Sequence, residues 1–280
     1  MKNLIKNLAI LSAIVFAFAS CNSDDTPDNK EGTVKVQLTD AVFPFDFVTQ
    51  ANVEVAKVEL KTAEGEFITV FKASGSGNST YNMVELTNGA TAEVESTSLE
   101  EGTYTEARVS LSGASIHLSD DSNFDANFDG TDAITTVSID PPLVVESGED
   151  SNVLFDLDLQ NSFGFQTGMG TWLDEWINSM AMITGCTFQP VFRVCDLDQT
   201  GKIEGTVTVG GTAFKNANVS IEVDGETINT HSEADGSFAF IGIKDGTYTV
   251  TAKTENDGTV QVGDITVSGN ETATCSLNIN

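Results

Sequence analysis

The chain is poor in the residues on which most catalytic and metal centres depend. Its 280 residues include two histidines, four cysteines and two tryptophans. Basic residues are also scarce, with 13 lysines and arginines against 42 aspartates and glutamates and a formal net charge of −29. A surface this acidic repels the phosphates of nucleic acids and of anionic lipids. We therefore expect no nucleic-acid partner, and any membrane attachment must depend on acyl chains.

Long apolar segments are scarce as well. One apolar segment, Leu8–Phe18, follows Lys2 and Lys6 and would rise only about 17 Å as a helix. A bilayer core is about 30 Å thick, so this segment is too short to span it. Its length and basic start predict a secretory signal peptide over residues 1–20. The later apolar segments are short, and we expect no transmembrane helix among them.

The signal segment ends at a single cysteine. Ala19 and Ser20 precede Cys21, an arrangement that resembles the lipobox of bacterial lipoproteins, in which the cysteine is diacylated. The alternative is an ordinary signal peptide with a chance cysteine. The stretch Asn22–Asp25 resembles the acidic tag that directs Bacteroidota lipoproteins to the cell surface. We expect palmitate on Cys21, a surface-exposed protein anchored in the outer membrane by its lipid, and an acidic tether over residues 21–31.

Three further cysteines exclude a complete set of paired bridges. Cys186 and Cys195 flank the alternating stretch TFQPVFRV, which as one strand would separate their Cα atoms by about 30 Å. A disulfide needs about 4.4–6.8 Å, so only a sharp turn at Gln189-Pro190 would bring the two together. We expect no disulfide between them, and a buried free thiol at Cys275.

Beyond residue 31 most of the chain alternates apolar and polar residues. Runs such as Val34–Leu38 and Val153–Leu159 are separated by clusters of Gly, Asn and Asp. This pattern predicts antiparallel β-sandwiches. The apolar phase slips between Val55 and Val58, which predicts a β-bulge near Ala56-Lys57.

Two phrases each occur twice in the chain, the first at 31–41 and 204–214 and the second at 99–111 and 243–254. In the second phrase a glycine-centred turn leads into a strand with an aromatic residue, Tyr104 or Tyr248, two positions after the glycine. The repetition predicts two tandem sandwiches of related design, over residues 32–197 and 202–280.

One segment, Thr171–Ile183, has helical periodicity instead. Thr171 fits an N-cap, and Trp172 and Trp176 fall on one broad apolar face. We predict a short amphipathic helix inserted in the first sandwich. Two rings four residues apart could stack a sugar and form a ligand platform. The interpretation that we favour is that both rings pack the helix onto the sandwich.

Family resemblances follow from longer motifs. The stretches YNMVELTNGAT, LEEGTYTEARVSLSG, LFDLDLQNSF and FQPVFRV resemble the domain-of-unknown-function 4382 family, from about Gly32 to Val194. That resemblance implies a secreted or lipidated bacterial domain, and it implies nothing for the tryptophan-rich insert. Residues 202–280, with Asp235-Gly236 and Gly246 in place, resemble the carboxypeptidase regulatory-like domain. That resemblance implies a transthyretin-like or carbohydrate-binding-like fold, a spacer or binding accessory, and no catalytic residue.

The best metal candidate is the stretch DANFDGTD. Asp125, Asn127 and Asp129 match the opening of a calcium loop, and Asp132 adds a further carboxylate. The twelfth position holds threonine where a bidentate glutamate belongs, so the loop is no EF-hand. A looser calcium loop and a solvated acidic hairpin both stay open, and we favour the hairpin. We expect no other cofactor.

Catalytic motifs are missing from the sequence, which contains no nucleophile elbow, zinc-protease helix or phosphate loop. We therefore expect a non-enzymatic surface lipoprotein that acts in adhesion, extracellular binding or envelope organisation, with a carbohydrate or another envelope protein as partner. A glycan- or peptide-processing enzyme with an unrecognised carboxylate site is one alternative, and a structural spacer is another. Converging carboxylates or a histidine in a cleft would favour the enzyme, an aromatic strip would favour binding, and neither would favour the spacer.

Overall fold

The computed structural model describes residues 30–40, 46–74, 79–126, 128, 132–167, 170–172, 183–254 and 258–280. Nearly all regular structure in this part is β-strand, which confirms the all-β prediction. Before residue 200 the strands are β1 (Glu31–Asp40), β2 (Val48–Lys61), β3 (Phe67–Lys72), β4 (Thr80–Asn82), β5 (Ala92–Glu100), β6 (Gly102–Leu118), β7 (Asn123–Asp125), β8 (Ala133–Val145), β9 (Asp150–Leu157), β10 (Phe163–Thr167), β11 (Gly170–Trp172), β12 (Ile183–Phe188) and β13 (Phe192–Asp196). After it they are β14 (Gly201–Val209), β15 (Thr212–Ala213), β16 (Asn218–Val223), β17 (Glu226–His231), β18 (Ser237–Ile243), β19 (Gly246–Thr254), β20 (Gly258–Val267) and β21 (Thr272–Ile279).

Helical structure in the described residues is confined to short turns: η1 (Met83–Glu85), α1 (Leu159–Ser162) and η3 (Leu197–Gln199). None of these is long and apolar enough to cross a bilayer. The α1 turn follows β9 directly, and the Asp158 carboxylate caps it by accepting a hydrogen bond of 2.9 Å from the Asn161 backbone N–H. Leu159 is buried although it lies in α1 and not in β9. The apolar alternation of the sequence therefore extends one step beyond the end of the strand.

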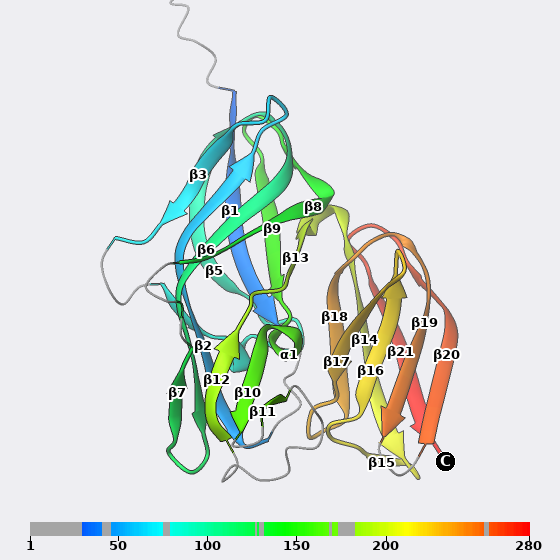
Figure 1. Ribbon diagram of the computed structural model, residues 1–280. Helices are drawn as coiled ribbons and strands as arrows, with labels where there is room; N and C mark the ends of the chain where they lie inside the picture. The colour runs from blue at the N-terminus through cyan, green and yellow to red at the C-terminus, as the bar shows by residue number, and fades with distance from the viewer. Residues whose placement is uncertain are drawn as a thin grey trace, which may run out of the picture.

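The first sandwich is one curled sheet path, in the order β3-β2-β6-β8-β13-β9-β1-β5 (Figure 1). Strand β4 joins the edge of β2, and β7 joins β6. The two end strands, β3 and β5, contact each other, and β8 passes from β6 to β13. Alternate residues of β1, from Val34 to Leu38, face the enclosed core as the period of two requires.

Strand β2 contains the predicted bulge. Its register against β6 shifts between Val55 and Lys57, which leaves Ala56 as the extra residue. Val53 before the shift and Leu60 after it are both buried. The bulge thus returns the apolar side chains to the core after the phase slip, and the prediction is confirmed.

Strands β10, β11 and β12 form a separate small sheet, and here the sequence prediction fails. Trp172 lies in β11 and pairs with Phe165 of β10, while Ile183 is the first residue of β12. The predicted helix over Thr171–Ile183 is therefore wrong at both ends; residues 173–182 lie outside the described part. The backbone pairing of β11 with β10 therefore outweighs the local helical period at these positions.

The second sandwich packs two four-stranded sheets, β15-β14-β18 with β21 paired to β14, and β17-β16-β19-β20. Its core cluster runs from Ile203 to Ile279 and shares no residue with the first core, which runs from Val34 to Val194. Three strand pairs are parallel: β1 with β9, β8 with β13 and β14 with β21. The alternation of apolar and polar residues indicates which face of a strand is buried, but it carries no information on strand direction. The sequence therefore does not predict these parallel pairs.

The repeated phrases occupy equivalent places. Strands β1 and β14 each have an antiparallel neighbour on one side and a parallel neighbour on the other. The Tyr104 hydroxyl donates to the carbonyl oxygen of Glu100 (3.0 Å), and the Tyr248 hydroxyl donates to that of Lys244 (2.8 Å). Each tyrosine therefore closes the turn four residues before it, and the sequence likeness corresponds to a shared contact.

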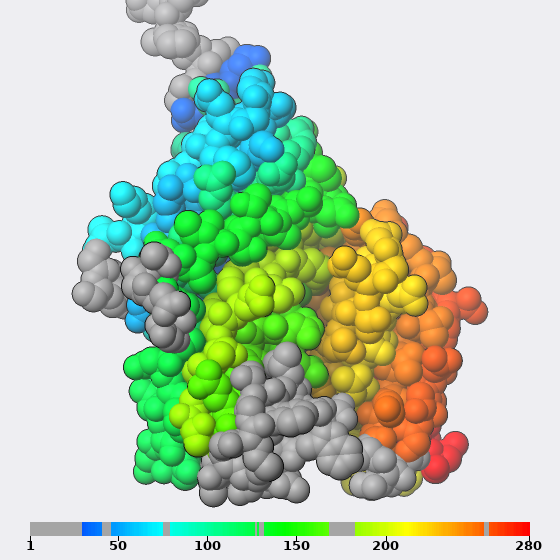
Figure 2. Space-filling view, in the orientation of Figure 1, coloured from blue at the N-terminus to red at the C-terminus, as the bar shows by residue number. Residues whose placement is uncertain are grey.

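The two sandwiches lie side by side, and the second one (yellow to red) covers a flank of the first (Figure 2). Arg193 of β13 crosses the junction between them. Its guanidinium donates to the carbonyl oxygens of Ile241 (2.7 Å) and Gly242 in β18, and to the Asp156 carboxylate of β9 (2.7 Å). The Arg193 side chain is 28% exposed. An arginine held by three fixed acceptors gives this junction one geometry.

Exposed polar contacts surround Arg193 at the rim of the junction. The Lys244 ammonium pairs with Asp140 of β8, and the Lys215 ammonium lies 2.7 Å from the Asp46 carboxylate. The hydrogen bond from Lys215 lowers the pKa of Asp46. Exposed pairs of this kind contribute little stability, about 0–1 kcal/mol each, so they add specificity to the contact that Arg193 makes.

The cysteines lie on different strands. Cys186 belongs to β12 and Cys195 to β13, with a break at residues 189–191 between the strands, so the interpretation of one continuous strand is wrong. The structure records Cys186, Cys195 and Cys275 as free, the first two buried and the third half-buried. The strand is interrupted at Gln189-Pro190, where proline cannot donate to a strand ladder.

Candidate functional site

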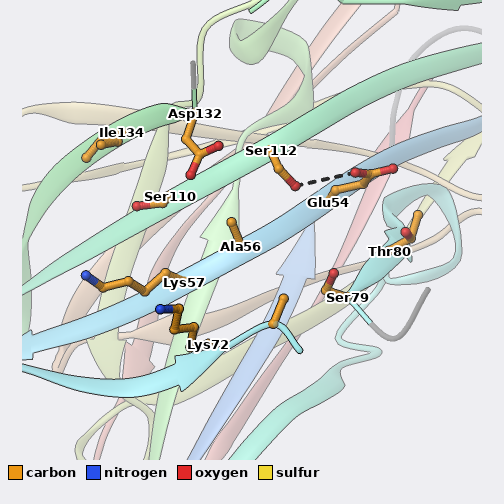
Figure 3. A pocket seen from close by; sticks show the side chains of 11 residues that line it. Glu54, Ala56, Lys57, Lys72, Ser79, Thr80, Ser110, Ser112, Asp132 and Ile134 are labelled. Atoms are coloured by element: carbon orange, nitrogen blue, oxygen red, sulfur yellow. Dashed lines mark hydrogen bonds between the residues drawn. The ribbon is translucent and has the colours of Figure 1, made fainter. Parts of the chain in front are cut away.

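A polar groove of about 590 Å³ opens on the outer face of the first sandwich, over the bulge of β2 (Figure 3). Strands β3 and β4 both pair with β2, on either side of the bulge, and so leave a gap along its edge. The Ala73 N–H donates to Ala56 at one end of this gap (2.9 Å), and the Val55 N–H donates to Ser79 at the other (2.8 Å). The floor between them is the small side chain of Ala56.

The bulge also decides which side chains face the groove. In a regular strand Glu54 and Lys57 would point to opposite faces, because side chains alternate. The extra residue at Ala56 puts both on the outer face. Bulges often re-aim side chains at functional sites, and this one places a carboxylate and an ammonium in the same hollow.

The Glu54 carboxylate is held in place. It accepts a weak hydrogen bond from the Ser112 hydroxyl (3.4 Å), drawn as a dashed line in Figure 3. Its side chain lies across Gly113, where an added Cβ would come within 3.0 Å of the carboxylate. The lack of a side chain at Gly113 therefore leaves room for the Glu54 side chain. Asp132, Ser110 and Thr80 line the same hollow.

Two lysines stand at the opposite end. Lys57 and Lys72 are direct cross-strand partners, and Figure 3 shows their ammonium groups on the same side. Lys57 lies 2.8 Å from the Glu59 carboxylate, which also faces Arg108 at 3.5 Å. Arg108 in turn covers the ring of Phe67, 3.6 Å from its centroid.

This face of the molecule is unusual in its charge. Strands β2, β3 and β6 carry Lys57, Lys61, Lys72 and Arg108 on it, four of the 13 basic residues of a chain whose net charge is −29. The same face carries the carboxylates of Glu54, Glu59, Glu106 and Asp132, so its charges balance in a strongly acidic chain. Glu59 and Glu106 pair with three of the four cations, which leaves Lys72 as the cation of this face without an ion pair to a described carboxylate. The groove suits a small polar ligand that bears a negative charge.

The predicted calcium loop is only partly described. Asp125 ends β7 and Asp132 lines the groove, while Asn127 and Asp129 lie outside the described residues. Across the residues that are described, no three His, Cys, Asp or Glu side chains gather where they could hold a metal ion. The choice between a looser calcium loop and the solvated acidic hairpin that we favour therefore stays untested by the described residues.

The other predicted site residues fare differently. Trp172 lies in a strand, which removes the shared helical face proposed for the tryptophan pair, and Trp176 lies outside the described residues, as does Cys21. Among the described residues the exposed large hydrophobic side chains are aliphatic: Ile134, Val144 and Val191. The aromatic strip that would favour sugar stacking is therefore not found in this part of the chain.

The fold defines an all-β protein of two sandwiches, and sequence comparison assigns each sandwich to a family. The model of the family described as "Domain of unknown function (DUF4382)" matches residues 31–173, just over half of the chain, and the chain belongs to that family. The carboxypeptidase regulatory-like domain matches residues 202–280. Both resemblances inferred from the motifs are confirmed. No curated protein matches the chain.

Solved structures give weak likenesses. The Bacillus anthracis TIE protein is 8% identical, over 88% of this chain and 40% of its own, with a TM-score of 0.25. A leucine-rich repeat protein from Bacteroides thetaiotaomicron is 13% identical, over 89% and 26%, with a TM-score of 0.20. BcpA, the major pilin subunit of Bacillus cereus, is 12% identical, over 90% and 70%, with a TM-score of 0.23. The chain thus spans less than half of the first two proteins, and at these scores the likenesses carry no argument.

Proposed function

We propose that this protein is a non-enzymatic module, anchored in the outer membrane by a lipid on Cys21 and exposed on the cell surface, that binds a polar extracellular ligand. The polar groove over the β2 bulge carries the proposal. Its volume lies within the usual range of small-molecule sites, about 300–1,000 Å³. Its hydroxyls, carboxylates and ammonium groups suit a ligand rich in hydroxyl groups, and carbohydrate is the first class to test.

The position of the sandwich supports a surface role. Strand β1 begins at Glu31, ten residues after Cys21. Ten extended residues reach at most about 36 Å, so a lipid on Cys21 would hold the first sandwich close to the membrane. We expect labelled palmitate to be incorporated into the protein and lost in Cys21→Ala. A Cys275→Ala control should keep the label; labelling that survives Cys21→Ala contradicts the anchor.

Ligand binding is tested on a glycan array with the full-length protein in detergent, with and without calcium. The proposal expects retention of a defined subset of glycans. Retention that depends on calcium would assign a role to the loop around Asp125 and Asp132. If the protein retains no glycan in either condition, the carbohydrate proposal is wrong.

A structural role is the second candidate, and the junction at Arg193 favours it. A hinge of two freely moving sandwiches would not need an arginine with three acceptors across the contact. In this proposal the second sandwich braces the first and fixes the direction in which the groove faces. Glu54 and Asp132 place two carboxylates in the groove, which is the arrangement among the described residues that the enzyme alternative requires.

A further inference from the structure

The two ends of the groove differ in chemistry, and the difference specifies a ligand. Lys57 and Lys72 form one end, and Glu54 with the hydroxyls of Ser112, Thr80 and Ser79 forms the other, while Asp132 and Ser110 lie along the side between them (Figure 3). A neutral ligand would leave the lysine end without a partner. A ligand with hydroxyl groups beside its negative charge would find partners at both ends.

The lysine end is incompletely neutralised. Like charges on directly opposed residues of neighbouring strands destabilise a sheet unless an anion lies between them. Lys57 has such an anion in Glu59, at 2.8 Å. Lys72 has none: among the described basic residues, Lys72 and Lys253 alone form no ion pair with a described carboxylate. In a chain with 42 acidic residues, a lysine that lies beside another lysine and has no ion pair with a described carboxylate offers a position for an external anion.

The acidic end fits hydroxyl groups. A carboxylate accepts hydrogen bonds from sugar hydroxyls, and Glu54 is already oriented by Ser112 and Gly113. The hydroxyls of Ser112 and Thr80 both donate and accept, as those of a sugar do. A phosphate would be repelled here, since it concentrates more negative charge on one group than a carboxylate does and offers fewer hydroxyl groups than a sugar.

Ring stacking plays no part in the groove. Its apolar lining consists of aliphatic side chains, and the nearby Phe67 ring is already covered by Arg108. Binding therefore depends on hydrogen bonds and on the charge at the lysine end. Such binding is screened by salt, because Lys72 is exposed.

We propose that this groove binds an acidic saccharide, with the carboxylate of a uronic acid at Lys57 and Lys72 and the sugar hydroxyls at Glu54 and Asp132. This assignment rests on the proposed function and names the ligand class of the same site. An acidic peptide, which offers carboxylates with few hydroxyls, is the competing occupant and enters the test below.

Calorimetric titration of the full-length protein in detergent provides the test, with trigalacturonate as the probe. Maltotriose supplies a neutral saccharide of equal length, and a tri-aspartate peptide supplies carboxylates without sugar hydroxyls. Lys72→Gln removes the unneutralised ammonium and leaves the Lys57–Glu59 pair intact. Lys253→Gln is the matched control, an exposed strand lysine of the second sandwich that also lacks a described ion pair.

We expect trigalacturonate to bind at least tenfold more tightly than maltotriose or tri-aspartate, and to bind at least fivefold more weakly to Lys72→Gln. Lys253→Gln should bind as the unaltered protein does, and raising the salt from 50 to 500 mM should weaken binding. Equal affinity for trigalacturonate and maltotriose, tighter binding of tri-aspartate, or an unchanged Kd in Lys72→Gln would each overturn the assignment. If neutral glycans are retained on the array while trigalacturonate fails, this inference is wrong and the proposed function stands.

Discussion

Gly242 has a backbone and surroundings that both exclude a side chain. Its φ of +67° lies in the left-handed region, and an added Cβ would come within 2.7 Å of the Cys195 sulfur across the junction. The left-handed conformation costs a residue with a Cβ about 1–2 kcal/mol, and overpacking adds about 1–3 kcal/mol. We expect Gly242→Ala to lower the free energy of unfolding by about 2–5 kcal/mol in urea titrations.

Gly225 is the matched control for Gly242. Its φ is +85°, and an added Cβ would meet nothing within 4 Å. Gly225→Ala should therefore lose only the conformational part, about 1–2 kcal/mol. If the two variants lose the same stability, the close approach to Cys195 makes no contribution.

The buried thiols predict a loss of stability at alkaline pH. Burial raises the pKa of Cys195 from 9.0 to about 11, and burial together with Asp125 does the same for Cys186. The folded state keeps these protons up to about pH 11, while the unfolded state releases them near pH 9. Their contribution is thus complete below pH 9 and is lost between pH 9 and 11. Each thiol should lower the free energy of unfolding at pH 10 by about 1.4 kcal/mol.

Other groups titrate in the same range, so the measurement compares variants. In Cys195→Ala the difference in the free energy of unfolding between pH 7.5 and pH 10 should shrink by about 1.4 kcal/mol. Val194→Ala, which removes bulk from the neighbouring buried position of the same strand, should keep the full difference. A full difference in Cys195→Ala would show that this thiol titrates alike in both states.

At the scale of the element, the two tyrosine-closed turns are a shared device of the sandwiches. Tyr104→Phe and Tyr248→Phe each remove a hydrogen bond to a turn carbonyl and leave the ring in place. We expect each to lower the free energy of unfolding by about 1 kcal/mol. Tyr81→Phe is the control, because the structure records no hydrogen bond from the Tyr81 hydroxyl to a described residue. An equal loss in all three variants would contradict the turn-closing role.

How far the sequence predicts these elements depends on the range of the interaction involved. Alternation reports a buried face, and a phase slip reports a bulge, so β1 and the bulge at Ala56 were predictable. The strand at Trp172 was not, since its conformation depends on a partner strand that the local helical period does not register. The signal in the repeated glycine-tyrosine phrase was local, and it corresponds to a contact between residues four apart.

The groove was missed for the same reason. Its lining comes from strands β2, β3, β4, β6 and β8 and from two connections. Alternation places side chains on one face of a strand but does not indicate which strands are neighbours. Lys57 and Lys72 are fifteen residues apart in sequence and meet only through the register of β2 and β3. The predicted bulge was the one available signal, because a bulge re-aims side chains at sheet edges. The predicted loop residue Asp132 does reach the groove rim.

At the scale of the whole molecule, the junction decides whether the two sandwiches move as one body. Arg193 supplies a positive charge at the junction. Its guanidinium contacts the negative charge of Asp156 and the dipoles of two carbonyl groups. Removing one partner of a largely buried pair leaves the other without compensation, which costs about 3–5 kcal/mol. Part of the loss falls on the contact between the sandwiches, because Ile241 and Gly242 belong to the second one.

Arg193→Met keeps the apolar bulk of the side chain and removes its charge and donors. We expect calorimetry to resolve two thermal transitions in place of one, and small-angle scattering to give a larger radius of gyration, since the sandwiches would then separate on a linker at Thr200. Arg108→Met is the control, because Arg108 pairs with Glu59 at 3.5 Å on the face away from the junction and contacts no residue of the second sandwich in the structure. A single transition and an unchanged radius in Arg193→Met would mean that the remaining contacts, the rim pairs and the packing of Cys195 and Leu154 against Gly242, hold the junction. If the sandwiches do separate, one arginine sets the direction in which the groove faces. Arg193→Met should then bind a free saccharide with unaltered affinity. It should retain less of a glycan that is fixed to a surface.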